Sequence, residues 1–126
     1  MITGGLGFIG SNLARRLAGL GAELTLVDSL IPDYGGNLFN IEPIRDRITI
    51  NFCDIRDTNV MNYLVKEQDF VFHLAGQVAV TTSAVEPRED LEVNLLGTFN
   101  VLEAIRSLPE GSRPCLLFTS TNKVYG

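Results

Sequence analysis

The stretch Ile2-Thr3-Gly4-Gly5-Leu6-Gly7-Phe8-Ile9-Gly10 decides the interpretation of the fold. Its first two residues are β-like, and apolar residues at helical spacing follow from Asn12 to Leu20. A chain turns sharply from strand to helix, or brings backbone N–H groups against a diphosphate, only where side chains are small. The spacing G-x-x-G-x-x-G therefore indicates either a tight turn without a ligand or a pyrophosphate-binding loop.

Asp28 favours the second interpretation. It ends the apolar run 24–27, eighteen residues after Gly10. An acidic residue at the tip of the second strand is the hydrogen-bond acceptor that a ribose diol requires. The order strand, glycine loop, helix, strand and acid therefore predicts that the chain binds a dinucleotide cofactor.

The composition narrows the class of protein. The chain has 126 residues, 45% of them hydrophobic, and a formal net charge of −5, which predicts one folded domain. No basic cluster exceeds Arg15-Arg16, so neither a nucleic acid nor a membrane is expected as a partner. The sequence contains no long apolar run and no basic leader, and we expect a cytoplasmic protein.

The cysteines do not indicate a metal centre. Cys53 and Cys115 are distant in the sequence, and His73 is the one histidine, so these residues do not make a zinc site. Both cysteines fall in strand-like runs. We expect free thiols in the core, in a reducing compartment, and no bound metal.

Apolar strand-like runs alternate with helical patterns along the chain. Strands are predicted over 1–3, 23–27, 47–53, 69–74 and 114–119, and helices over 11–20, 57–67 and 88–108. The connection 29–45 contains two prolines and two glycines and has room for one short helix. This order predicts an α/β fold, a Rossmann-type doubly wound parallel sheet with strand order 3-2-1-4-5. The ligand is expected between the first and fourth strands.

Four motifs resemble those of the extended short-chain dehydrogenase/reductases, the NAD-dependent nucleotide-sugar epimerases and dehydratases. They are Thr-Gly-Gly-x-Gly-Phe-Ile-Gly (3–10), His-Leu-Ala-Gly (73–76), Asn-x-x-Gly-Thr-x-Asn (94–100) and Ser-Thr-x-x-Val-Tyr-Gly (120–126). The stretches 73–83 and 120–126 most resemble the CDP-paratose 2-epimerase (tyvelose epimerase) branch. UDP-glucose 4-epimerases and nucleotide-sugar 4,6-dehydratases of the same family are the alternatives.

The resemblance implies NAD as the cofactor and gives roles to individual residues. Around the pyrophosphate and the adenosine ribose it places Gly4, Gly7, Phe8, Ile9, Gly10 and Asp28. Beside the adenine and along the path to the nicotinamide it places Asp54, Ile55, Leu74, Ala75, Gly76 and Val78. Asn94 would stand near the active centre, and Thr121 matches the family's catalytic Ser/Thr.

Some of these residues also have a purely structural interpretation. Asp54 could cap a turn before Arg56. Ala75 and Gly76 could be small because the sheet packs tightly there. Asn94 could be a buried helix amide bonded to neighbouring backbone. These alternatives stay open at the level of sequence.

Three further polar sites are expected to be structural rather than catalytic. His73 lies within an apolar strand and is expected to be a hydrogen-bonded core residue rather than a base. Residues 81–83 are expected to prepare the turn before Pro87, although contact with substrate is the alternative. Lys123 is expected to be a solvated loop residue rather than a ligand of a substrate phosphate.

The acid/base motif of the family, Tyr-x-x-x-Lys, does not occur in the sequence. Tyr34 and Tyr63 are followed four positions later by leucine and glutamate, and Tyr125 is the penultimate residue. We therefore expect residues 1–126 to be an NAD-binding domain fragment that is truncated before the substrate domain. A nucleotide sugar would be held mostly by the missing part, and the full-length enzyme would be a homodimer. The alternative of another class is a regulatory NAD-binding module without turnover.

Overall fold

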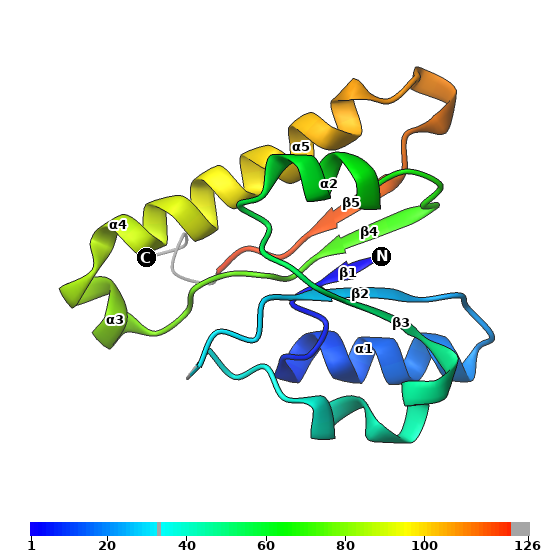
Figure 1. The fold of residues 1–126 in the computed structure, drawn as a ribbon, viewed down its shortest axis with the longest axis horizontal. Helices are drawn as coiled ribbons and strands as arrows, with labels where there is room; N and C mark the ends of the chain where they lie inside the picture. Colours follow the sequence, from blue (N-terminus) through cyan, green and yellow to red (C-terminus); the bar gives the residue numbers. More distant parts are fainter. Residues whose placement is uncertain (33, 122–126) are drawn as a thin grey trace.

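A five-stranded parallel sheet forms the centre of the computed structural model, which describes residues 1–32 and 34–121 (Figure 1). The strands are β1 (Ile2–Thr3), β2 (Thr25–Asp28), β3 (Thr49–Phe52), β4 (Phe70–His73) and β5 (Cys115–Phe118). Their order is β3-β2-β1-β4-β5, and every neighbouring pair is parallel. The predicted fold class and strand order are confirmed.

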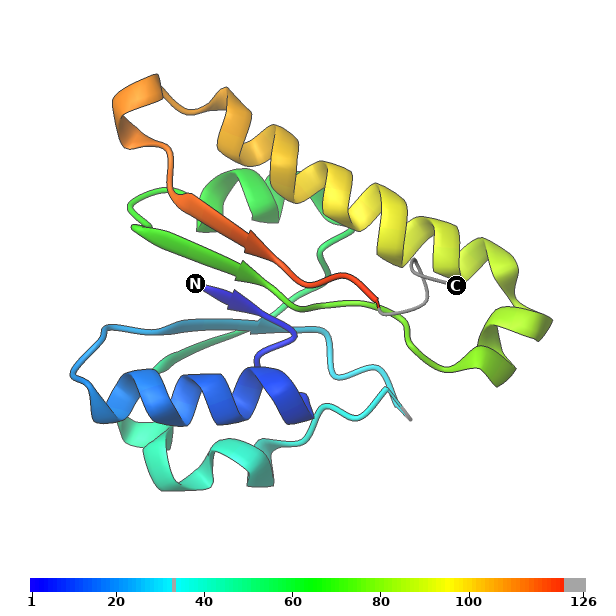
Figure 2. The same ribbon diagram turned by 180° about the vertical axis from the view of Figure 1, so that it is seen from behind.

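Helices cover both faces of this sheet, as the two opposite views show (Figures 1 and 2). One layer consists of α1 (Phe8–Gly19) and the 3₁₀ helix η1 (Leu38–Arg47). The other contains α2 (Thr58–Leu64) and a long helical segment that runs from Pro87 to Ser107. That segment is divided into α4 (Pro87–Asp90), the π-helix η2 (Leu91–Gly97) and α5 (Thr98–Ser107). Two short helices, α3 (Val80–Val85) and the 3₁₀ helix η3 (Glu110–Ser112), complete the described elements.

The short strand β1 is central because it pairs on both sides. Ile2 lies opposite Leu26 of β2 and Phe72 of β4, and Thr3 lies opposite Val27 and His73. Two apolar clusters pack against the opposite faces of the sheet. The glycine loop that follows Thr3 therefore leaves the middle of the sheet at the carboxyl ends of its strands.

The predicted helix boundaries were inexact: α2, for example, ends at Leu64 rather than at residue 67. Helix α1 begins at Phe8 rather than at residue 11, because the extended backbone of Gly7 serves as its N-cap. Residues 81–83, which were expected to prepare the turn before Pro87, belong to helix α3, which ends at Val85 just before Pro87 begins α4. The β-branched residues Val80, Thr81 and Thr82 have low helix propensity, so no helical signal was visible there. In the structure, Ser83 Oγ donates to Ala79 O at 3.1 Å and braces this helix.

His73 is the hydrogen-bonded core residue that the sequence predicted. Its side chain is 1% exposed, with Nδ1 2.7 Å from Thr3 Oγ1 and Nε2 2.9 Å from Thr98 Oγ1. Thr98 Oγ1 donates to Asn94 O at 2.7 Å, so it accepts from His73 Nε2–H. Burial lowers the pKa of His73 to about 4, and the ring is neutral at pH 7.

The sequence predicted that both thiols lie in the core, and this prediction was wrong for Cys115. Cys53 is partly buried, whereas Cys115 is exposed, because β5 lies at the edge of the sheet in the described residues. Each helix within residues 1–32 and 34–121 is too short or too polar to cross a lipid bilayer.

Candidate functional site

A cleft of about 380 Å³ opens at the carboxyl ends of the strands, where β1 and β4 lie side by side. Most of the predicted cofactor residues line it: Gly4, Gly7, Phe8, Ile9, Gly10, Asp28, Asp54, Ile55, Leu74, Ala75, Gly76 and Val78. The chain reverses the direction of its crossovers between β1 and β4, and open α/β sheets bind ligands at such a point. The cleft therefore lies where the sequence predicted the ligand.

The glycine loop packs too tightly for a side chain at Gly4 or Gly10. Gly4 has φ +65°, and a Cβ added at Gly10 would lie 2.9 Å from Gly4 C and from Gly5 Cα. Gly7 N–H closes the loop onto Gly4 O at 3.2 Å, and the helix ladder starts with Ser11 N–H donating to Gly7 O at 3.0 Å. The loop thus brings the start of α1 directly over the end of β1.

The first turn of α1 faces the cleft with its positive end. The N–H groups of Phe8, Ile9 and Gly10 precede the first helix bond and have no acceptor within the helix. This turn contains no acidic side chain, and no side chain caps it. An anion in the cleft would therefore meet unpaired donors together with the favourable end of the helix dipole.

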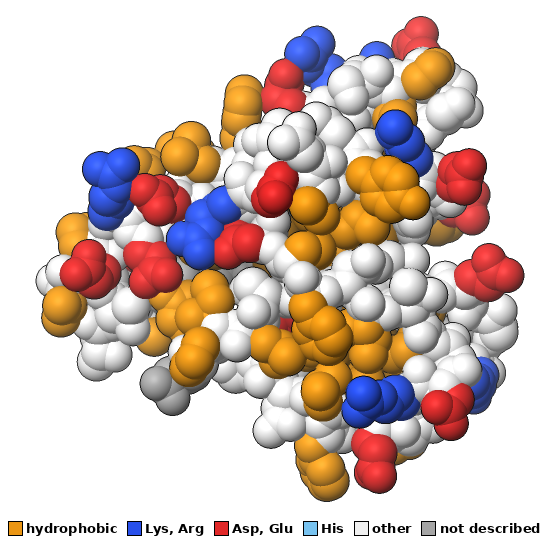
Figure 3. Space-filling model, in the orientation of Figure 1, with side chains coloured by type: hydrophobic (Ala, Val, Ile, Leu, Met, Phe, Trp, Pro, Cys, Tyr) orange, Lys and Arg blue, Asp and Glu red, His pale blue; other side chains and the backbone are white. Residues whose placement is uncertain are grey.

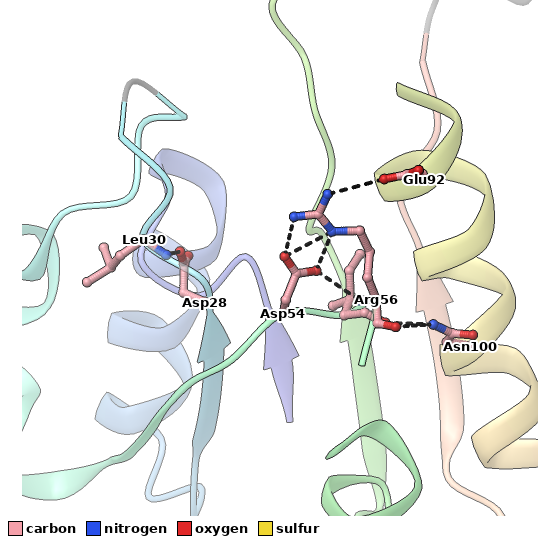
Figure 4. Close-up of polar contacts among 7 residues, drawn as sticks. Asp28, Leu30, Asp54, Arg56, Glu92 and Asn100 are labelled. Atoms are coloured by element: carbon pink, nitrogen blue, oxygen red, sulfur yellow. Dashed lines mark hydrogen bonds and ion pairs between the residues drawn. The ribbon is translucent and has the colours of Figure 1, made fainter. Parts of the chain in front are cut away.

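Asp28 is fixed in place by two backbone donors. Leu6 N–H donates to Oδ2 and Leu30 N–H donates to Oδ1, each at 3.0 Å. Figure 4 shows the carboxylate at the end of β2 beside Leu30. Each carboxylate oxygen can accept more than one hydrogen bond, so both oxygens keep the capacity to accept from a ligand.

The turn after β3 is held by an ion pair. Arg56 Nη2 lies 2.6 Å from Asp54 Oδ2, Arg56 Nε lies 3.0 Å from both carboxylate oxygens, and Arg56 N–H donates to Asp54 Oδ1 at 2.8 Å. Burial alone would raise the pKa of Asp54, but the hydrogen bonds from Arg56 lower it. Asp54 therefore caps the turn before Arg56, as the structural interpretation proposed, and also lines the cleft.

Residues of α4, η2 and α5 support the same turn. Arg56 Nη1 lies 3.7 Å from Glu92 Oε2, and Asn100 Nδ2 donates to Ile55 O at 3.1 Å and to Arg56 O at 3.0 Å (Figure 4). Glu92 also accepts from Arg88 Nε at 2.7 Å. Figure 3 shows acidic and basic side chains interleaved over α4 and the start of η2.

Asn94 fixes the loop after β4. Its Oδ1 accepts from Gln77 N–H at 2.8 Å, and its Nδ2 donates to Gln77 O at 3.0 Å. The amide is bonded to neighbouring backbone, as the structural interpretation proposed, but the side chain is exposed rather than buried. Asn94 does not line the cleft itself. It lies next to Gly76, which does, since a Cβ at Gly76 would lie 3.1 Å from Asn94 Oδ1.

Thr3 shapes the start of this loop from the neighbouring strand. Its hydroxyl oxygen accepts from Leu74 N–H at 3.2 Å and from Ala75 N–H at 3.1 Å. A Cβ at Gly4 would lie 2.9 Å from Ala75 N, so the glycine loop and the end of β4 touch. Ala75 is therefore tightly packed, as the structural interpretation of the sequence proposed. The same residue also lines the cleft.

Thr121 lies after β5 and is exposed, outside the lining of the cleft. Lys123, Val124, Tyr125 and Gly126 of the motif 120–126 lie outside the described residues. Within the described residues, no group of three or more His, Cys, Asp or Glu side chains is placed to hold a metal ion.

Several lining residues were not predicted. They are Val27, Ser29, Ile31, Tyr34, Gly35, Gly36, Cys53 and Val93. Most belong to the connection between β2 and η1. The pair Gly35-Gly36 was the available signal that this connection approaches another part of the chain closely.

Comparison with known proteins agrees with this geometry. A family model described as GDP-mannose 4,6-dehydratase matches residues 1–126. The chain is 42% identical over its whole length to a CDP-paratose 2-epimerase of Salmonella typhi, and 36% identical to a dTDP-glucose 4,6-dehydratase of Mycolicibacterium smegmatis. It spans 37% of the length of each of these relatives.

A solved structure shows the same fold. UDP-glucose 4-epimerase of Stenotrophomonas maltophila, with bound NAD and formylated UDP-arabinopyranose, matches with a TM-score of 0.85 and 30% identity. The match covers 99% of this chain and 37% of that one. Fold, cleft and comparisons agree, and the chain belongs to the extended short-chain dehydrogenase/reductases, the family of NAD-dependent epimerases and dehydratases.

Proposed function

We propose that the cleft binds NAD and that residues 1–126 form the cofactor-binding domain of a nucleotide-sugar epimerase. The observation that carries this proposal is the hydrogen bond between Leu6 N–H and Asp28 Oδ2, at 3.0 Å. It joins the loop suited to a pyrophosphate to the acid suited to a ribose. Both carboxylate oxygens of Asp28 keep the capacity to accept from a ligand, which the two backbone donors alone would not require.

The residues of the cleft fit the parts of NAD. The N–H groups of Phe8, Ile9 and Gly10 are donors for the pyrophosphate, and the close packing at Gly10 leaves no room for a side chain at that position. Asp28 accepts from the adenosine ribose, and Asp54 and Ile55 stand beside the adenine. Leu74, Ala75, Gly76 and Val78 form the wall toward the nicotinamide, and Asn94 positions that wall through Gln77.

When bound, NAD supplies a hydride acceptor that takes a hydride from a sugar carbon and returns it. This chain contributes binding and orientation to that chemistry. The hydroxyl of Thr121 is proposed to hydrogen-bond the reacting oxygen of the sugar. His73 holds β1, β4 and α5 together as a neutral ring and takes no proton from substrate.

The finer function is that of a CDP-paratose 2-epimerase, supported by the 42% identity to the Salmonella typhi enzyme. We further propose that the complete enzyme is a homodimer that binds a nucleotide sugar. An apolar stripe along η2 and α5 supports the dimer, since Leu91, Leu95, Phe99 and Leu102 are 45–59% exposed.

Two measurements test these proposals. Calorimetric titration of NAD into the chain should give saturable binding, and its absence would overturn the assignment of the cleft. The complete enzyme, assayed with CDP-paratose, UDP-glucose and dTDP-glucose, should act on the first. Turnover of either of the other two instead would assign the chain to a 4-epimerase or a 4,6-dehydratase.

A further inference from the structure

Tyr34 connects the two sides of the cleft. It belongs to the connection between β2 and η1, and it lines the cleft together with Gly35 and Gly36. Its phenol also lies near enough to Glu89 and Asp90 of α4, and to Arg56 beyond β3, for their charges to act on it. Helix α4 belongs to the opposite layer of the molecule (Figures 1 and 2). One side chain thus spans from the Asp28 side of the cleft to the Asp54 side.

The connection that carries Tyr34 is held close to Asp28. It starts with Leu30 N–H donating to Asp28 Oδ1 at 3.0 Å and ends with Asn37 N–H donating to Leu6 O at 3.0 Å. A Cβ at Gly36 would lie 2.9 Å from Asp28 Oδ1, so the backbone passes directly against this carboxylate. Tyr34 is therefore placed beside the acid that is proposed to bind the adenosine ribose.

The hydroxyl of Tyr34 has no well-aligned partner. Among the described residues, Tyr34 Oη and Asp90 Oδ1 are the buried side-chain polar atoms without a hydrogen bond of good geometry. The interaction with the Glu89 carboxylate, followed by burial, raises the pKa of Tyr34 to about 12. The phenol is therefore protonated at pH 7 and available as a donor to α4 or to a ligand.

We propose that Tyr34 is a cofactor-binding residue that closes the adenosine end of the cleft. Its ring forms the outer wall over the ribose and the adenine, and its hydroxyl ties the connection to Glu89 of α4. The inference rests on the NAD binding proposed above and adds a residue that the motifs of the sequence do not contain. The ligand class is an adenosine diphosphate, because Tyr34 lies at the Asp28 and Asp54 end.

ADP-ribose is the probe that tests this wall, because it lacks the nicotinamide. Calorimetric titration should show about tenfold weaker binding to Tyr34→Ala than to the wild type, since stacking on an aromatic ring is lost. Tyr34→Phe keeps the ring and Glu89→Ala removes the tether, and each should weaken binding about two- to fourfold. Tyr63→Ala is the matched control, because Tyr63 is 72% exposed on α2 and should leave the affinity unchanged.

A second readout does not depend on the alanine variant. The chain contains no tryptophan, so tyrosine emission can be followed directly. ADP-ribose should quench this emission in Tyr63→Phe and much less in Tyr34→Phe.

The role of Tyr34 alone would be overturned by either of two results. One is that the wild type binds ADP-ribose and Tyr34→Ala binds it with the same affinity. The other is equal quenching of tyrosine emission in Tyr34→Phe and Tyr63→Phe. No binding of ADP-ribose or NAD to the wild type would overturn it together with the proposed function.

Discussion

The backbone N–H of Leu6 donates a hydrogen bond to the carboxylate of Asp28, at 3.0 Å and across 22 residues of sequence. The glycine loop and the acid of the second strand are therefore parts of one structure rather than two independent motifs. Since the same carboxylate accepts from Leu30 N–H, its orientation is set before any ligand arrives. A preorganised acceptor binds with a smaller loss of side-chain entropy.

The packing of the glycine loop predicts a selective effect of an added methyl group. Gly10→Ala should lower the free energy of unfolding by about 1–3 kcal/mol and abolish NAD binding, because the new Cβ collides with backbone of Gly4 and Gly5. Gly19→Ala is the control in the same helix, with nothing within 4 Å of its Cβ. It should be neutral or stabilising by up to about 1 kcal/mol. Urea unfolding and calorimetry measure both; equal stability of the two variants would contradict the packing described.

The buried ring of His73 predicts a loss of stability in mild acid. Its folded pKa of about 4 lies below the ordinary histidine value of 6.5, so the unfolded chain binds a proton first as the pH falls. The contribution is complete above pH 6.5 and is lost progressively toward pH 4. Urea unfolding should give a free energy about 2 kcal/mol lower at pH 5 than at pH 7. His73→Gln should flatten this dependence, and an unchanged slope in that variant would refute the assignment to His73.

The clamp between Asn94 and Gln77 predicts a coupling between η2 and the loop after β4. Asn94→Ala removes both hydrogen bonds to the Gln77 backbone and should cost about 1 kcal/mol of stability. It should also weaken NAD binding several-fold, because the loop forms one wall of the cleft. Asn59→Ala, on the exposed surface of α2, serves as the control. Equal NAD affinities of these two variants would contradict the positioning role of Asn94.

The sheet could be predicted from the sequence because each strand carries its own signal. The apolar runs around Leu26, Ile50, Val71 and Leu116 occur in the order that a doubly wound sheet requires. Helix α3 could not be predicted, because Val80, Thr81 and Thr82 have low helix propensity. The periodicity of residues 88–108 predicted a helix there but did not indicate the π-helical turns of η2. Cys115 is exposed because its strand lies at the edge of the sheet. The apolar pattern of residues 114–119 does not reveal that position.

Some residues of the candidate site could likewise be predicted from the sequence, and others could not. Gly4, Gly10 and Asp28 were predictable, because a turn, a close backbone approach and a strand tip each require particular residue types. Tyr34 was not, because its position depends on the path of the connection between β2 and η1. That path is set by hydrogen bonds to Asp28 and Leu6, which no local pattern encodes.

The choice between NAD and NADP tests the central claim most directly. A 2′-phosphate beside Asp28 would meet a like charge at a cost of about 1–4 kcal/mol, and no Arg or Lys occurs between Asp28 and Arg45 to offset it. Titration of both cofactors should give at least a roughly tenfold preference for NAD. Asp28→Ser should weaken NAD binding and reduce the difference in affinity between NAD and NADP. Equal affinities of the wild-type chain for NAD and NADP would contradict the role of Asp28 and, with it, the assignment of the cleft.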